Sequence, residues 1–156
     1  MKKIRFTKGE IDGVIITDLK KFSDHRGNVL TMMRSDSKLF DKFGEIYFST
    51  VFCNSIKAWH FHKNAVLNYA CIKGRVRLVL FDDRKNSNSK GKYNEYILTP
   101  DNYFLITIPS LVWNGFVGLD KEESIIANCL NLPHDEDEME RREYNDKYLN
   151  YNWENK

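Results

Sequence analysis

VLNYACIKGRVRLVLFD, residues 66–82, consists of two apolar runs separated by the dipeptide Lys73-Gly74. In the second run Val76, Leu78 and Leu80 alternate with the other side chains, and a period of two is typical of a β-strand. Lysine followed by glycine between two apolar runs is a turn signal, because glycine adopts backbone conformations that other residues avoid. The stretch therefore predicts two strands joined by a turn.

Short β-rich runs of this kind recur along the whole chain. They lie at residues 13–17, 27–34, 45–52, 56–62, 66–72, 75–82, 94–98, 103–108, 115–117 and 124–130. Turn-forming residues separate them, for example at 24–27, 83–92 and 99–102. Many short strands at this spacing predict an all-β sandwich or barrel, and the length of 156 residues predicts a single domain over 1–156.

The C-terminal part has a different character. Residues 134–143 are highly charged and follow Pro133, with acidic residues before basic ones. That order suits the helix macrodipole, so we expect a short, solvated surface helix there. The aromatic tail at 144–153 is expected to dock on the barrel or on a partner subunit.

Composition and charge exclude several classes of protein. The net charge of +2 is too small to favour binding to nucleic acid or to an anionic membrane. No apolar run approaches the ~20 residues of a membrane span, and no apolar segment follows the basic start. The three cysteines form no Cys-x-x-Cys pair, and Cys71 and Cys129 lie in apolar runs, which favours a reducing compartment. We therefore expect a cytoplasmic protein.

The stretch Lys57-Ala58-Trp59-His60-Phe61-His62-Lys63 is the main candidate for chemistry. On a strand, His60 and His62 share one face with Ala58, while the intervening aromatic residues share the other. Imidazole has an unperturbed pKa of about 6.5, which suits proton transfer near neutral pH. The alternative is that both histidines are structural groups of the barrel interior.

A metal site is the other alternative for a His-x-His pair, but it needs further ligands. Residues 64–68 contain no carboxylate, and the later Trp113-Asn114-Gly115-Phe116 offers an amide rather than an imidazole. No phosphate loop, nucleophile elbow or dinucleotide fingerprint is present. We therefore predict neither a metal nor a cofactor.

Five segments occur in an order that resembles one protein family. They are Phe22-Ser23-Asp24-His25-Arg26-Gly27, Lys57-Ala58-Trp59-His60-Phe61, Phe81-Asp82-Asp83-Arg84-Lys85-Asn86-Ser87, Ile108-Pro109 with Asn114-Gly115-Phe116, and Tyr144-Asn145-Asp146 through Trp153. Together they resemble the motifs of the dTDP-4-dehydrorhamnose 3,5-epimerase family, over about residues 13 to 153.

The resemblance implies a cupin jelly-roll barrel of two antiparallel sheets that acts on a nucleotide-diphosphate sugar. It implies that His60 is the general base, that Lys57 contacts the diphosphate, and that Arg26 and Phe22 line the nucleotide-sugar pocket. We add Trp59, next to the base, to the expected substrate-binding residues. The resemblance also implies a homodimer and a role in bacterial surface polysaccharide synthesis.

The chain departs from the family pattern at four places. The segment 124–129 has no tyrosine where the family has its catalytic acid, Asn114 replaces a second histidine, and Leu67 replaces a lysine. The resemblance implies that the carboxylate that orients the family's base lies in a C-terminal extension, and we expect that carboxylate to be missing here. A second cupin family, the nucleotide-sugar 3,4-ketoisomerases, is similar in having a tyrosine, here Tyr47, ahead of a His-x-His-Lys motif.

These observations predict a cofactor-independent epimerase of a dTDP- or CDP-linked 4-keto-6-deoxyhexose that inverts C3, with C5 as a second candidate centre. Proton abstraction beside the C4 ketone gives an enolate, and its developing O4 charge needs hydrogen-bond donors. His62, Asn114 and Tyr47 are the candidate catalytic donors. A ketoisomerase of the same fold and a non-catalytic sugar-binding cupin remain as alternatives.

Overall fold

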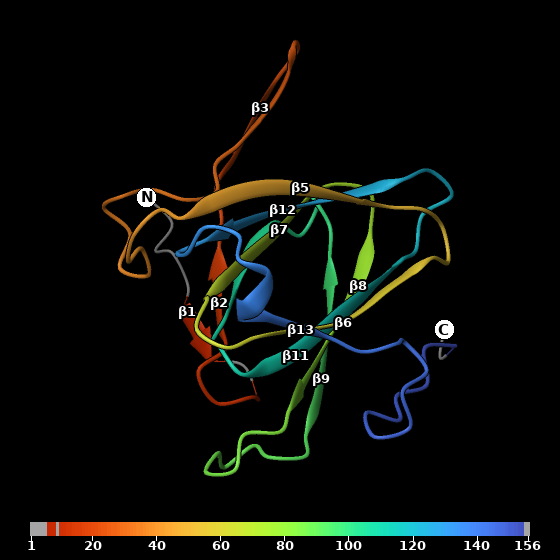
Figure 1. Ribbon diagram of the computed structural model, residues 1–156. Coiled ribbons are helices and arrows are strands. Elements are labelled where there is room, and N and C mark those ends of the chain that lie inside the picture. The colour runs from red at the N-terminus through yellow and green to blue at the C-terminus, as the bar shows by residue number, and fades with distance from the viewer. Residues whose placement is uncertain (1–5, 9, 155–156) are drawn as a thin grey trace.

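Two antiparallel sheets face each other across the molecule, and a hairpin stands away from them, in a computed structural model that describes residues 6–8 and 10–154 (Figure 1). The six-stranded sheet has the order β1 (Phe6–Lys8), β2 (Ile15–Asp18), β10 (Phe104–Ile108), β7 (Leu67–Lys73), β12 (Ser124–Leu130), β5 (Glu45–Val51). The five-stranded sheet has the order β13 (Met139–Arg141), β6 (Ile56–His62), β11 (Val112–Gly118), β8 (Val76–Asp82), β9 (Tyr93–Leu98). The hairpin consists of β3 (Lys21–Asp24) and β4 (Gly27–Leu30). The predicted all-β class is confirmed.

The main core lies between the two sheets, and β8 shows how the sequence builds it. Val76, Leu78 and Leu80 belong to this inner core, whereas Val79 and Phe81 pack on the outer side of the sheet. All seven residues of β8 are buried, because both of its faces are covered. Full burial of a large apolar side chain contributes roughly 1.5–3 kcal/mol, so β8 stabilises both layers.

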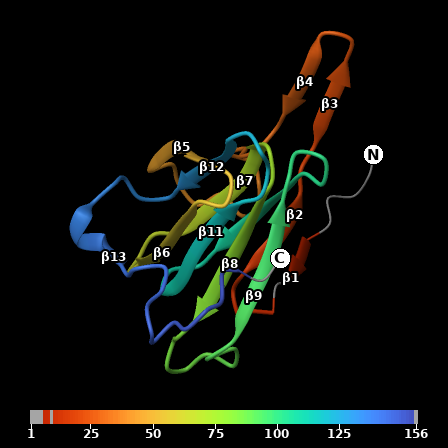
Figure 2. The ribbon, with the colours of Figure 1, turned by 90° about the vertical axis from the view of Figure 1, so that its right-hand side faces the viewer.

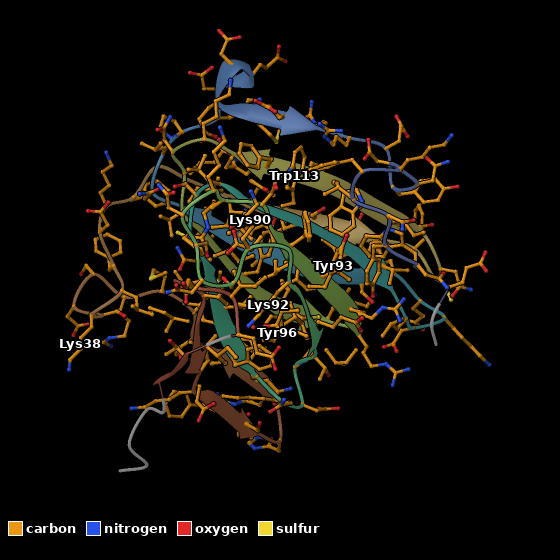
Figure 3. All side chains as sticks on the ribbon, turned by 90° about the horizontal axis from the view of Figure 1, so that it is seen from below. Lys38, Lys90, Lys92, Tyr93, Tyr96 and Trp113 are labelled. Atoms are coloured by element: carbon orange, nitrogen blue, oxygen red, sulfur yellow. The ribbon has the colours of Figure 1, made fainter. Side chains whose placement is uncertain are left out.

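The outer side of the five-stranded sheet is covered by the aromatic tail, as predicted. Trp59 is fully buried, with its ring centroid 5.0 Å from that of Trp153 and 6.0 Å from that of Tyr151. Trp113 belongs to the same layer and lies within the packed side chains of Figure 3, where Lys38 projects from the loop before β5. The odd-numbered aromatic residues of β6 therefore anchor the tail.

Two glycines are required where backbone segments approach closely. Gly74 has φ +74° in the predicted turn, and a Cβ there would lie 2.3 Å from Ser124 Oγ. A Cβ at Gly115 would lie 2.4 Å from the Cβ of Ala58, so this glycine lets β11 approach β6 beside the histidines.

The C-terminal charged segment forms less helix than the sequence predicts. The helix is one 3-10 turn, η1 (Glu136–Glu138), and β13 follows it directly. Backbone hydrogen bonds join this segment to β6, from Lys63 N to Glu138 O (3.0 Å) and in both directions between Trp59 and Arg142 (2.7 and 3.1 Å). An open strand edge needs partners for its N–H and C=O groups, and β13 supplies them to β6. Strands β1, β3 and β13 are absent from the predicted set.

Candidate active site

A cavity of about 500 Å³ opens between the sheets. Strands β5, β7 and β12 supply one wall, β6 supplies the facing wall, and residues 133–141 border it as well. This volume is within the range of roughly 300–1,000 Å³ that is typical of small-molecule sites. The polar side chains that line it include Tyr47, Lys57, His60, His62, Tyr69 and Arg141.

His60 and His62 both line the cavity, because alternate residues of β6 share a face. Burial, and after it the positive charges of Arg141, His62 and Lys57, lower the pKa of His60 to about 4. The His60 imidazole is therefore neutral near pH 7, with a lone pair that can accept a proton. This is the protonation state that a general base requires.

His62 is paired with a carboxylate that the sequence did not reveal. Glu138 Oε2 lies 2.7 Å from His62 Nδ1, and the two side chains are 11% and 10% exposed. Glu138 Oε1 accepts hydrogen bonds from the backbone N–H groups of Asn64 (2.6 Å) and Ala65 (2.8 Å). Burial by itself would raise the pKa of Glu138, but these hydrogen bonds and that of His62 outweigh it, and the pKa is lowered. The ionised Glu138 holds a proton on Nδ1 of His62 and leaves Nε2 as the nitrogen available to a ligand.

The segment that carries Glu138 also brings a cation to the cavity. Arg141 of β13 lies opposite His60 in the register of the β6–β13 pair, and both line the cavity. The sequence places both residues in a run that suggests a solvated helix. No local pattern indicates that this run pairs with a strand more than seventy residues earlier.

The wall opposite the histidines carries two tyrosines. The register pairs Asn128 of β12 with Tyr47 of β5 on one side and with Tyr69 of β7 on the other. All three line the cavity, so they form one row across three strands. Segment 124–129 indeed lacks a tyrosine, but the neighbouring strands supply two. Tyr69 could have been found from the sequence, because it shares the inward face of its strand with Leu67.

Asn114 lies beneath the cavity and is fully buried. Its Nδ2 donates to the backbone carbonyl of His60 (3.1 Å), and its Oδ1 accepts from the hydroxyl of Tyr69 (3.2 Å). Burial, and after it the charge and hydrogen bond of Tyr47, raise the pKa of Tyr69 well above its usual value. Asn114 is therefore committed to protein groups on both sides, so it links the two walls and does not line the cavity itself.

Lys57 lines the cavity and donates from Nζ to Ser49 Oγ (3.2 Å). With Arg141 it places two cations around His60, an arrangement that suits an anionic ligand.

Three predicted binding residues do not reach this cavity. Trp59 belongs to the outer aromatic layer with Trp113 and Trp153 and does not line the cavity. Phe22 and Arg26 lie on the hairpin β3–β4, which extends away from the barrel (Figure 2). Phe22 is 58% exposed, and Arg26 pairs with Asp24 at 2.7 Å.

In the part of the chain that the structure describes, no three His, Cys, Asp or Glu side chains gather as a metal site. Over the same residues no helix is long and apolar enough to cross a membrane.

The family model of dTDP-4-dehydrorhamnose 3,5-epimerase matches residues 8–156. The chain belongs to this family. It is therefore a nucleotide-sugar epimerase, which is an isomerase, and the family resemblance of the sequence is confirmed.

The similar proteins are of the same kind. Spore coat polysaccharide biosynthesis protein SpsL of Bacillus subtilis is 30% identical over 145 residues, covering 92% of this chain and 96% of SpsL. The probable low-salt glycan biosynthesis epimerase Agl13 of Haloferax volcanii is 31% identical, covering 85% of this chain and 86% of Agl13. The crystal structure of a dTDP sugar isomerase from Desulfovibrio desulfuricans G20 is 34% identical with a TM-score of 0.90, covering 96% of this chain and 94% of that one.

Proposed function

We propose that this epimerase inverts C3 of a dTDP-linked 4-keto-6-deoxyhexose. The observation that carries the proposal is the arrangement of the cavity, with His60 and His62 on one wall and the hydroxyls of Tyr47 and Tyr69 on the other. Inversion of a carbon needs a base on one face of the sugar and an acid on the opposite face, and facing walls supply both.

In this proposal His60 is the base. The C4 ketone acidifies the proton on C3, and the neutral imidazole removes it to give an enolate. A base with a pKa of about 4 is weak, so the free protein is not yet in its reactive state. When the diphosphate pairs with Arg141 and Lys57, their repulsion of a proton on His60 is reduced, and its basicity rises. Substrate binding thereby activates the base.

His62 has a different role in the proposal: with a proton on both ring nitrogens, its Nδ1–H donates to Glu138 and its Nε2–H donates to the developing charge on O4. An enolate oxygen is stabilised by donors that are already in place, because no reorganisation is needed during the reaction. Glu138 holds the His62 ring at 2.7 Å and is itself fixed by two backbone N–H groups. A carboxylate that is hydrogen-bonded to one ring nitrogen orients the imidazole, as in other sites where a third group positions the base.

We also propose that the protein is a homodimer in which the hairpin β3–β4 contacts the partner subunit. The hairpin exposes Phe22 and Val29 (58% and 62%), and edge strand β5 exposes Phe48 (61%). Exposed apolar side chains and an open sheet edge both favour association. In a dimer Phe22 and Arg26 could reach the nucleotide in the partner's cavity, which they do not reach in their own subunit.

The names of SpsL and Agl13 support a role in the synthesis of a surface polysaccharide or glycan. The free thiols of Cys53, Cys71 and Cys129 are compatible with a cytoplasmic location.

The experiment is incubation of the protein in deuterated water with dTDP-4-keto-6-deoxyglucose, followed by NMR of the product. We expect deuterium at C3 with inverted configuration, and loss of nearly all turnover in His60→Asn. The control is Tyr96→Phe, since Tyr96 packs against the core and does not line the cavity. Deuterium at C5 as well would extend the reaction to both centres. Movement of the carbonyl to C3 would instead identify a ketoisomerase, and tight binding without any exchange would identify a sugar-binding cupin.

A further inference from the structure

Two hydrogen-bonded pairs of polar side chains, Asn128 with Tyr47 and Tyr69 with Asn114, lie next to each other between the two sheets. Asn128 Nδ2 donates to the hydroxyl of Tyr47 (2.9 Å), and Tyr47 lies close enough to Tyr69 to contribute to the raised pKa of Tyr69. The Tyr69 hydroxyl donates to Asn114 Oδ1 (3.2 Å). Asn128, Asn114 and Tyr69 are 0%, 0% and 4% exposed, whereas Tyr47 is 36% exposed and is the member most accessible to a ligand.

Backbone groups fix which atom of Asn128 and which atom of Asn114 faces the tyrosines. Asn128 Oδ1 accepts from the backbone N–H of Asn68 (3.1 Å), a group that can only donate. Asn114 Nδ2 donates to the backbone carbonyl of His60 (3.1 Å), a group that can only accept. Neither amide can be flipped without losing its backbone bond, so Asn128 presents a donor to Tyr47 and Asn114 presents an acceptor to Tyr69.

The hydroxyl protons follow from these two amides. Tyr69 has one O–H, and it is committed to Asn114. Tyr47 already accepts from Asn128, so its own proton is left to donate, either to Tyr69 or to an atom in the cavity. We propose that Tyr47 is the proton donor opposite His60 and that Tyr69 is the positioning residue that orients it, an inference that rests on the proposed epimerase function.

The enolate formed by His60 returns its electron pair to C3, a C–H bond forms there as the O–H bond of Tyr47 breaks, and the C4 ketone is restored. Tyr47 becomes a phenolate that keeps the Asn128 hydrogen bond, and Tyr69 can turn its O–H from Asn114 to the phenolate. The raised pKa of Tyr69 keeps its own proton in place during this step. Water then takes the proton from the His60 imidazolium and returns one to Tyr47.

The test separates proton removal from inversion. Tyr69→Phe keeps the ring, which packs edge-on against Phe116, and removes only the hydroxyl. We expect C3 exchange with deuterated water to continue in this variant, because His60 is unchanged. Inversion should fall at least about tenfold, since a hydrogen bond to a charged group is lost. A mostly structural effect would lower exchange and inversion together and would overturn the proposal.

Two further variants keep the test decisive if Tyr69→Phe is unstable. Tyr47→Phe changes a more exposed residue and should also exchange without inverting. The double variant Tyr47→Phe/Tyr69→Phe should invert the sugar at the same rate as Tyr47→Phe alone, because Tyr69 acts through Tyr47. If the losses in inversion rate of the two single variants multiplied in the double variant, the proposal would be overturned. Tyr96→Phe is the control, as Tyr96 packs against the same core but does not line the cavity. Wild-type protein without any exchange would refute the epimerase function, whereas normal inversion in Tyr69→Phe would refute only the role of Tyr69.

Discussion

The lowered pKa of His60 predicts a specific dependence of stability on pH. Its pKa is about 4 in the folded protein, against 6.5 for an unperturbed histidine. Between these values the unfolded chain takes up a proton that the folded protein does not, so this contribution to stability is fully present above pH 6.5 and is lost as the pH falls toward 4. At roughly 1.36 kcal/mol per pK unit, the full loss is about 3 kcal/mol, and about 2 kcal/mol of it is reached by about pH 5.

The measurement is the free energy of unfolding in guanidinium chloride at about pH 8 and about pH 5, for the wild type and for His60→Gln. Other groups also titrate over this range, so the informative quantity is the difference between the two proteins. We expect the wild type to lose about 2 kcal/mol more than His60→Gln. His25→Gln, at the exposed hairpin tip, should lose as much as the wild type. Equal losses in wild type and His60→Gln would show that His60 titrates normally, and the description of it as a buried neutral base would be wrong.

Two further predictions concern the C-terminal segment. Glu138→Gln should lower kcat by roughly 10- to 100-fold while far-UV circular dichroism stays unchanged, because His62 loses the carboxylate that fixes its ring; an unchanged kcat would remove Glu138 from the site. Arg141→Met should raise KM for the dTDP-sugar and also raise the pKa of His60, because a nearby positive charge is removed; NMR titration of the imidazole measures the second effect, and a pKa that stays near 4 would contradict the assigned cause.

The strands that carry the histidines could be predicted because their pattern is local. The period of two in Ile56–His62 places His60 and His62 on one face, and the structure has them on that face. The same period places Trp59 on the other face, so an expected contact between Trp59 and substrate conflicts with the strand pattern itself. The family motif contains Trp59 and His60 side by side in the sequence, but adjacent residues of a strand point to opposite faces of the sheet.

The partners of these strands could not be predicted, because they come from distant parts of the chain. Residues 139–141 contain two charged side chains and read as a solvated surface, yet they complete the edge of β6. Their conformation is decided by the unpaired backbone of β6 and not by their own propensity. The tyrosine row has the same origin, since only the register of three strands brings Tyr47 and Tyr69 to either side of Asn128.

The position of β13 at the end of the described chain affects how the molecule must be made. His62 and Glu138 are separated by 76 positions, and Trp59 is covered by residues that lie still later. While the chain is being synthesised, β6 therefore emerges with an open edge, an imidazole without its carboxylate and an uncovered indole. A fragment that ends after β12 would keep most of the barrel strands. It would expose the unpaired backbone edge of β6 and the apolar ring of Trp59, and His62 would lack Glu138. Proteolysis near Pro133 should accordingly abolish turnover and promote aggregation at the same time.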